Sequence, residues 1–422
     1  MERFLIIGSG PAAISAIETI RGKGSKVEIT LLSEEPYIPY SRPLISYLLA
    51  GKIEEERLFY KGRDFYERYG VKAFLEEPAV EVNIREGIVY STKGRKFTYD
   101  KLLIAAGGKP IIPAVEGKEL KGVFTFTTLN DAKNIAKYLE VEKAERVLIV
   151  GGGLIGLKAT EALLEWNLNI TLVELADRIL SLTLDKKASN ILQWRLEKES
   201  VKVITSNTVQ EIRGQKKVEE VSLRSGEILP CDMLIFAIGV APSVSFLRES
   251  GVEINRGIIV NEKMETNIPN IYAAGDVVEI KNIISGKNQP IAIWPNATEG
   301  GKVAGANMLG EDKFYPGTFP MNSVEVCGIP TISMGLTEPE GNDYEVFSKE
   351  EGINYRKVIL RDNRVVGAVF VGNIERAGIF CGLIKDHLDV SPFKSRLLDD
   401  DFGLIYLPRE YRKRKIEEAI GL

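Results

Sequence analysis

Short apolar runs and glycine-rich turns divide the first half of the chain into two similar units. The first unit opens with the apolar run 3–7 (RFLII), followed by the turn Gly8-Ser-Gly-Pro-Ala-Ala13 and a helical stretch to about Gly22. A second apolar run, 27–32, ends just before Glu34. Apolar runs of this length, bounded by glycine and separated by a helical segment, predict buried parallel strands joined by a helix.

The same order of segments returns about 140 residues later. The run 146–150 (RVLIV) leads into Gly151-Gly-Gly-Leu-Ile-Gly156, a helical stretch to about Trp166, and a strand over 169–173 that ends at Glu174. Strand, glycine-rich turn, helix, strand and acid make up the βαβ unit that binds dinucleotides. One such turn is weak evidence, but two in the same context strongly indicate two dinucleotide sites.

Each glycine or small residue of this pattern has a mechanical task. The first glycine permits the tight turn, the second lets backbone N–H groups approach a pyrophosphate, and the third small residue lets the helix pack closely on the strand. The phosphates would then lie at the helix N-terminus, and the acid would accept hydrogen bonds from ribose hydroxyls. This predicts a first site at Gly8, Gly10, Pro11, Ala12, Ala13 and Glu34, and a second site at Gly151, Gly153, Leu154, Ile155, Gly156 and Glu174.

Further strands are expected to complete the two parallel sheets. The run 99–108 ends in the small residues Ala105, Ala106 and Gly107, and the run 232–240 repeats this pattern up to Gly239. A third run, 270–276, ends in Gly275 and Asp276, which should face a ligand across the carboxyl edge of the sheet. A helix over about 128–144 would link the two units.

The last hundred residues show a different pattern. Short strands are expected at 323–326, 344–347, 356–361 and 365–371, followed by an irregular stretch from 392 that ends in a charged helix. The sequence therefore predicts an α/β fold with two Rossmann-like dinucleotide-binding domains and a C-terminal α+β domain.

Composition narrows the function. The 422 residues carry a formal net charge of -4, so no strong basic field exists to hold nucleic acid. No apolar run reaches the roughly 18 residues of a membrane span, and the chain enters a strand at once, so we expect a cytoplasmic protein. Because Cys231, Cys327 and Cys381 are far apart and His387 is the one histidine, we expect no disulfide framework, iron–sulfur cluster or other metal site.

These motifs resemble those of the two-dinucleotide flavoproteins, also called pyridine nucleotide–disulfide oxidoreductases. Besides the two turns, the resemblance rests on Ile271-Tyr-Ala-Ala-Gly-Asp276 and on the Ala-Ala-Gly-Gly stretch at 105–108. Tyr40-Ser-Arg-Pro-Leu44 is similar to the branch of NADH-dependent rubredoxin and ferredoxin reductases and the flavin module of assimilatory nitrite reductase. The resemblance implies two three-layer ββα domains, an FAD-binding domain (1–112 and 241–318) and an NAD-binding domain (113–240). An α+β interface domain (319–422) follows them.

The resemblance also implies FAD and NAD(H) as cofactors and assigns residues to them. Glu34 would bind the adenosine ribose, Arg42 and Pro43 would border the flavin, and Asp276 would meet the ribityl–pyrophosphate region. The helix 297–309 would point its N-terminus at the flavin, or would serve as a packing helix of small residues. The remaining residues expected at the cofactors are Val80, Ala105, Ala106, Gly107, Gly239, Gly275, Asn296 and Ala297.

The chain departs from the pattern of this family in three places, one of which is Ala106, where the family has threonine. Residues 39–46, where the thiol-dependent members carry a cysteine, contain none, so a thiol relay is unsupported. The lysine and the glutamate that ferredoxin-reductase relatives place near the flavin are Tyr47 and Lys158 here. One hypothesis makes Lys158 the cation at the flavin–nicotinamide contact, with Tyr47 as a hydrogen-bonding neighbour. The alternative pairs Lys158 with Glu161, one helical turn on.

The expected reaction is electron transfer between NADH and a separate carrier. Glu174 favours NADH because a carboxylate repels a 2'-phosphate, although Arg178 could grip that phosphate. The carrier would be a ferredoxin-like iron–sulfur protein or a rubredoxin; a stable complex with it and a homodimer stay open. The alternatives are an NADH oxidase, a subunit of a larger complex and an NADH sensor. Basic residues that could bind an acidic carrier, or form a solvated helix face, are Lys394, Arg396, Arg409, Arg412, Lys413, Arg414 and Lys415.

Overall fold

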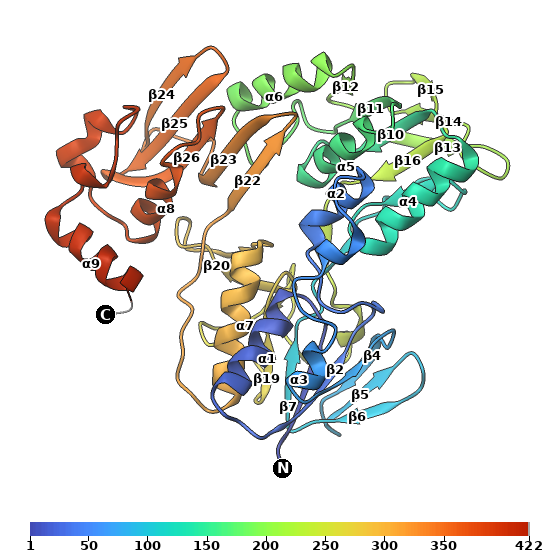
Figure 1. Cartoon of the computed structure of the whole chain (residues 1–422), viewed down its shortest axis with the longest axis vertical. Coiled ribbons are helices and arrows are strands. Elements are labelled where there is room, and N and C mark those ends of the chain that lie inside the picture. The colour runs from blue at the N-terminus through green and yellow to red at the C-terminus, as the bar shows by residue number, and fades with distance from the viewer. Residues whose placement is uncertain (421–422) are drawn as a thin grey trace.

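The computed structural model describes residues 1–420 (Figure 1). They form two units, each built on a parallel sheet, and a C-terminal region with an antiparallel sheet. The first sheet has the strand order β19-β7-β1-β2-β3 and is parallel throughout. Its strands are β1 (Arg3–Ile7), β2 (Glu28–Leu32), β3 (Val71–Phe74), β7 (Lys101–Ile104) and β19 (Ile271–Ala273). The sheet therefore combines the start of the chain with a strand that lies beyond the second unit.

The second sheet repeats the first, with the order β12-β11-β10-β16-β9. Its strands are β9 (Val123–Thr125), β10 (Arg146–Val150), β11 (Asn169–Val173), β12 (Lys202–Ile204) and β16 (Met233–Phe236). The registers correspond as well, since Ile7 lies opposite Leu32 in the first sheet and Val150 lies opposite Val173 in the second.

Helices cover one face of the second sheet and a small antiparallel sheet covers the other. Val147 and Ile149 of β10 pack into the core that includes α4 (Leu129–Glu142), α5 (Leu154–Leu164) and α6 (Lys186–Lys198). The alternate residues Leu148 and Val150 pack against β13 (Val209–Arg213), β14 (Glu220–Leu223) and β15 (Ile228–Pro230). This alternation, with both faces of the strand buried, confirms the expected three-layer ββα arrangement.

The first unit has the same layers. Its antiparallel sheet is β4 (Ala79–Asn83), β5 (Ile88–Ser91) and β6 (Lys96–Thr98), and its helices are α1 (Pro11–Gly22) and α7 (Trp294–Met308). These two helices lie side by side, and a Cβ on Gly301 would be 2.1 Å from the carbonyl oxygen of Ala12 (Figure 1). Helix α7 begins at Trp294, earlier than expected from the sequence, because a proline is tolerated in the first helical turn.

A two-stranded antiparallel ribbon joins the two units. It pairs β8 (Gly108–Pro110) with β17 (Val240–Pro242), and the N–H of Ile111 donates to the carbonyl of Gly239 at 3.0 Å. The chain thus leaves the first unit and returns to it through adjacent strands. The domain boundaries expected at 112/113 and 240/241 stay predictions, and both lie at or just beyond this ribbon.

The segment 37–58 extends from the first unit onto the second. Its short helix α2 (Ile45–Leu49) packs against α4 and α5, and Tyr40 and Leu58 belong to the same buried core as Ile149 (Figure 1). The indole N–H of Trp166 donates to the carbonyl of Leu49 at 2.7 Å. The remaining short elements of the two units are η1 (Arg42–Leu44), η2 (Glu55–Leu58), α3 (Phe65–Arg68) and η3 (Ser245–Leu247).

The C-terminal region is an antiparallel sheet with two longer helices. The strand order is β22-β23-β26-β25-β24. The elements are β22 (Met321–Val326), β23 (Ile329–Gly335), β24 (Glu345–Glu351), β25 (Asn354–Arg361), β26 (Arg364–Val371), α8 (Ala377–Lys385), η4 (Ser391–Arg396), η5 (Leu404–Tyr406) and α9 (Arg409–Ile420). The hairpin of β22 and β23 extends toward α5 and α6 (Figure 1).

The strand β23 is not expected from the sequence. The short strand β18 (Ile258–Ile259) lies outside the two parallel sheets. It forms a separate three-stranded sheet with β20 (Val278–Lys281) and β21 (Asn288–Pro290), in the order β18-β20-β21. Within residues 1–420, no helix combines the length and apolar character that crossing a membrane requires.

Candidate nucleotide-binding sites

The first glycine of each turn is required by the backbone. Gly8 has a φ of +108°, and a Cβ there would lie 2.1 Å from the carbonyl oxygen of Ala105. Gly151 has a φ of +112°, and its Cβ would lie 2.4 Å from the carbonyl oxygen of Ala237. The tight turn that the sequence predicts is therefore present in both units, and only glycine fits its first position.

The helix that follows each turn begins without a side-chain cap. Gly10 is the N-cap of α1 and Gly153 the N-cap of α5, and neither helix has an acidic residue in its first turn. A Cβ built on either glycine would meet no atom within 4 Å. In contrast, Thr128 caps α4 and Asp185 caps α6. Free N–H groups beside open space fit a pyrophosphate at both turns.

The two helices differ in how closely they rest on their turns. A Cβ on Gly156 would lie 1.8 Å from the carbonyl oxygen of Gly151, so α5 requires glycine there. Ala12 and Ala13 of α1 are buried, while Pro11 occupies its first turn. Leu154 and Ile155 are half-buried at the start of α5.

The acid of the second unit lies against its glycine turn. Glu174 Oε2 accepts the N–H of Gly152 at 2.5 Å, and Oε1 accepts the N–H of Ala176 at 2.7 Å. A carboxylate fixed there can accept ribose hydroxyls. In the first unit the corresponding strand position is Ser33, whose hydroxyl bonds that of Ser9 at 2.8 Å. Glu34 follows it, is exposed, and lies 3.2 Å from Lys109 Nζ.

Arg42 belongs to an ionic cluster with Glu35 and Asp276, and the sequence predicts a functional role for Arg42 and Asp276 but not for Glu35. Its guanidinium pairs with Glu35 and donates to the carbonyl of Thr127 at 3.3 Å. Burial opposes its charge, but Glu35 and Asp276 raise the pKa of Arg42 above its usual value. Burial raises the pKa of Asp276, and Arg42 opposes part of that shift. The sequence predicts a cofactor contact for Glu34, but the neighbouring Glu35 is the acid that binds Arg42.

The other residues expected at the two cofactors differ in exposure. Val80 is 48% exposed on β4, whereas Ala105 is buried beneath Gly8. Gly107, Gly239 and Gly275 have positive φ values. Ala106 is half-buried and Pro43 is exposed. Asn296 is buried, and its side-chain amide donates to the carbonyl of Ile291 at 2.8 Å, while Ala297 is also buried. The close packing of α7 on α1 confirms its packing role, and its role toward the flavin stays a prediction.

Lys158 makes the contact given by the alternative interpretation. Its Nζ donates to Glu161 Oε2 at 2.7 Å and to the carbonyl of Glu325 in β22 at 2.7 Å. Tyr47 is 42% exposed on α2. The pairing with Glu161 is confirmed, and the contact of Lys158 and Tyr47 with the flavin stays a prediction. The sequence could not indicate the bond to Glu325, because the two residues are 167 positions apart.

The basic residues near the C-terminus mostly carry acidic partners. The ion pairs are Lys394–Glu345, Arg396–Asp399, Arg396–Asp401, Lys413–Glu417, Arg414–Asp386 and Lys415–Asp386. Pairing of this kind favours the interpretation as a solvated helix face over a strongly positive docking patch.

The three cysteines are unpaired and poorly suited to redox chemistry as thiolates. Burial raises the pKa of Cys231 to about 12 and that of Cys327 to about 11, and it also raises the pKa of Cys381. A thiol needs a lowered pKa to react near neutral pH.

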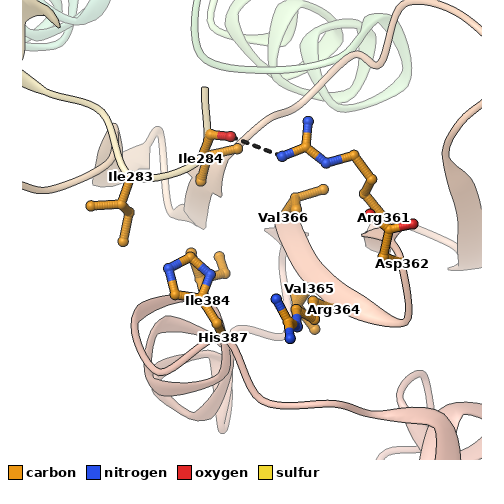
Figure 2. Close-up of a pocket in the computed structure, with 9 residues that line it drawn as sticks. All are labelled: Ile283, Ile284, Arg361, Asp362, Arg364, Val365, Val366, Ile384 and His387. Carbon is orange, nitrogen blue, oxygen red and sulfur yellow. Dashed lines mark hydrogen bonds between the residues drawn. The ribbon is translucent and has the colours of Figure 1, made fainter. Parts of the chain in front are cut away.

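A separate hollow of about 180 Å³ lies where the C-terminal domain meets the loop after β20. Ile283 and Ile284 face Arg361, Arg364 and His387 across it (Figure 2). None of the residues expected to bind a nucleotide lines this hollow.

Comparison with known proteins identifies the family. Residues 2–301 match the pyridine nucleotide-disulphide oxidoreductase family, and residues 320–388 match the rubredoxin NAD+ reductase C-terminal domain. The chain therefore belongs to the pyridine nucleotide-disulphide oxidoreductases, which use FAD and NAD(H).

Individual relatives have several activities. An NADH oxidase of Methanocaldococcus jannaschii is 37% identical over 88% of this chain and 87% of its own. Nitrite reductase of Bacillus subtilis is 31% identical over 92% of this chain, but the match spans only 48% of that protein. Among solved structures, an NAD-dependent persulfide reductase from A. fulgidus matches with a TM-score of 0.88 at 25% identity, over 99% of this chain and 84% of its own.

Proposed function

We propose that this protein passes electrons from NADH, through FAD, to a separate small iron–sulfur or rubredoxin-type carrier. The observation that carries the proposal is the pair of uncapped helices, α1 and α5, each beside open space at a glycine turn. The lack of a cysteine in residues 39–46 and the raised pKa values of Cys231 and Cys327 support an exit for electrons that uses no thiol.

The residues of the chain would bind and orient the two nucleotides. Free N–H groups of α1 and α5 would hold the pyrophosphates, and Glu174 would accept the ribose hydroxyls of NADH. Arg42, fixed by Glu35, would present its guanidinium at the flavin with Pro43 beside it. Bound FAD supplies the chemistry itself, because it accepts hydride and releases single electrons.

The nature of the carrier is supported by relatives. NADH-rubredoxin oxidoreductase of Clostridium acetobutylicum is 28% identical over 88% of this chain and 91% of its own. The structure of a covalent putidaredoxin reductase–putidaredoxin complex matches with a TM-score of 0.83 at 25% identity, over 92% of this chain and 94% of its own.

Stopped-flow mixing tests the proposal. The FAD-loaded protein is reduced with NADH without oxygen and then mixed with ferredoxin, rubredoxin or air-saturated buffer. We expect fast reoxidation by at least one carrier and slow reoxidation by oxygen. A variant without cysteines (Cys231→Ala, Cys327→Ser, Cys381→Ser) should reduce the carrier at the same rate. Loss of carrier reduction in a folded variant without cysteines would contradict the thiol-free route.

A second candidate is an electron-transfer subunit of a larger dehydrogenase. The epsilon subunit of an NADH-dependent phenylglyoxylate dehydrogenase from Aromatoleum evansii is 30% identical over 94% of both chains. This candidate predicts co-purification with other subunits at a fixed stoichiometry. Fast reoxidation by air would instead favour an oxidase, as in the M. jannaschii relative.

A further inference from the structure

An ion pair between two domains holds the arginine that lies closest in sequence to Glu174. Arg178 Nη2 lies 2.6 Å from Glu338 Oε2, and Nη1 lies 2.9 Å from Asp177 Oδ1. Only 15% of the Arg178 side chain is exposed. Glu338 comes from the segment after β23 in the C-terminal domain, and its Oε1 accepts the N–H of Lys186 at 3.3 Å. The carboxylate of Glu338 is therefore held on the second unit by two bonds.

The loop that carries Arg178 wraps around the second glycine turn. The N–H of Leu180 donates to the carbonyl of Gly152 at 2.8 Å, and the Ile179 side chain lies 3.0 Å from the position of a Cβ on Gly152. Glu174 bonds the N–H of the same glycine. Arg178 thus sits on the loop that surrounds the expected position of the adenosine ribose.

We propose that Glu338 sets the preference of the second site for NADH over NADPH by occupying Arg178. The inference rests on the proposed use of NADH. Glu174 would repel a 2'-phosphate, and Arg178 is the cation of the same loop that could bind that phosphate. A 2'-phosphate would have to displace the carboxylate of Glu338 from the guanidinium. Within residues 1–420, Arg178 Nε is buried without a hydrogen-bond partner, so the guanidinium retains an unused donor.

Binding of two nucleotide fragments tests the inference without turnover. Adenosine 2',5'-bisphosphate and AMP differ by the 2'-phosphate alone, and calorimetric titration gives Kd for each. We expect Glu338→Gln to lower Kd for the bisphosphate about 10-fold, the effect of one charge-assisted contact, with less than about a two-fold change for AMP. The ratio of kcat/KM for NADPH to that for NADH should rise by a similar factor.

Two further variants give the controls. Arg178→Met in the Glu338→Gln background should abolish the gain for the bisphosphate. Glu350→Gln breaks the ion pair of Glu350 with Lys187, 2.6 Å apart, and leaves Arg178 untouched. Both ion pairs join the C-terminal domain to the second unit. An equal gain in Glu350→Gln would mean that loosening the domain contact is the cause, which would overturn the inference.

The outcomes separate the two proposals. If the wild-type protein is reduced by NADH and Glu338→Gln leaves the Kd of the bisphosphate unchanged, the role of Glu338 is wrong and the proposed function stands. If the wild-type protein neither binds AMP nor is reduced by NADH, the proposed function itself is wrong. Melting temperatures of all variants within a few degrees of the wild type would show that each variant is folded.

Discussion

The glycines of the two turns are of two kinds, and single substitutions should separate them. Gly151 requires a positive φ and has a carbonyl where its Cβ would lie, so Gly151→Ala should destabilise the fold by about 2 kcal/mol or more. Gly153 has a φ of -80° and open space, so Gly153→Ala should leave the melting temperature unchanged but raise KM for NADH about 10-fold. Flavin content should stay constant in Gly153→Ala, and a loss of FAD would contradict the assignment of this turn to NADH.

Asp276 should make the stability of the FAD-free protein depend on pH. Burial raises its pKa, so the charged carboxylate is unfavourable in the folded state, and stability falls as pH rises above its ordinary value near 4. We therefore expect Asp276→Asn to raise the melting temperature at pH 7, with a difference that shrinks toward pH 4. Scanning calorimetry at the two pH values checks this. If Asp276→Asn and the wild type melt at the same temperature at each pH, Arg42 fully compensates the buried charge of Asp276.

Residue conformations could be predicted better than residue partners. The tight turn expected at the first glycine of each motif is present, and Gly8 and Gly151 have the positive φ that such a turn requires. Lys158 instead donates to the backbone carbonyl of Glu325, 167 positions away, and Arg178 pairs with the carboxylate of Glu338, 160 positions away. Which distant oxygen an arginine or lysine meets depends on how domains dock, and no local pattern carries that information.

At the scale of elements, the same ionic contact fastens the start of both sheets. Asp100 bonds the guanidinium and the backbone N–H of Arg3, where β1 begins, and Asp232 bonds those of Arg146, where β10 begins. The hydrogen bonds from Arg146 lower the pKa of Asp232 to about 2. The two units are therefore alike at both ends of β1 and β10, in the glycine turns that follow these strands and in the ionic contacts that precede them.

This contact predicts a pH-dependent loss of stability. Because the folded-state pKa of Asp232 is lowered, its contribution is present above about pH 4 and disappears as pH falls toward 2. Asp232→Asn should lower the free energy of unfolding by about 1–2 kcal/mol at pH 6. The gap to the wild type should narrow in urea titrations at pH 4 and 3. A gap of constant size would mean that geometry, not charge, is responsible.

Strand identity could be predicted where the apolar run was long and bounded by glycine. The strands β1, β10 and β11 begin or end within a residue of their expected limits. The sequence pattern does not predict β23, because this strand begins with Ile329-Pro330 and proline disfavours a strand. Pro330 is tolerated as the second residue, and the five residues that follow complete the strand between β22 and β26.

At the scale of the whole molecule, the second unit is joined differently to its two neighbours. The ribbon of β8 and β17 and the segment 37–58 connect it to the first unit. A buried ionic cluster connects it to the C-terminal domain: Asp185 is 3% exposed, its Oδ2 accepts the hydroxyl of Tyr355 at 2.7 Å, and Lys357 Nζ lies at 2.8 Å. Its Oδ1 also accepts the N–H of Ala188 and so caps α6 at 2.9 Å.

The cluster should be asymmetric in its contribution to stability. Asp185→Ala removes the cap of α6 and leaves Lys357 buried without its carboxylate, which should cost about 3–5 kcal/mol of unfolding free energy. Lys357→Met leaves Asp185 with the Tyr355 hydroxyl and the Ala188 N–H, so its cost should be only about 1–2 kcal/mol. Urea unfolding followed by tryptophan fluorescence measures the free energy of unfolding of both variants. The control is Glu350→Gln, which breaks the exposed Lys187–Glu350 pair and should cost less than about 1 kcal/mol. Equal costs for Asp185→Ala and Lys357→Met would mean that the attraction between the two charges, and not the hydrogen bonds of Asp185 to both domains, holds this interface together.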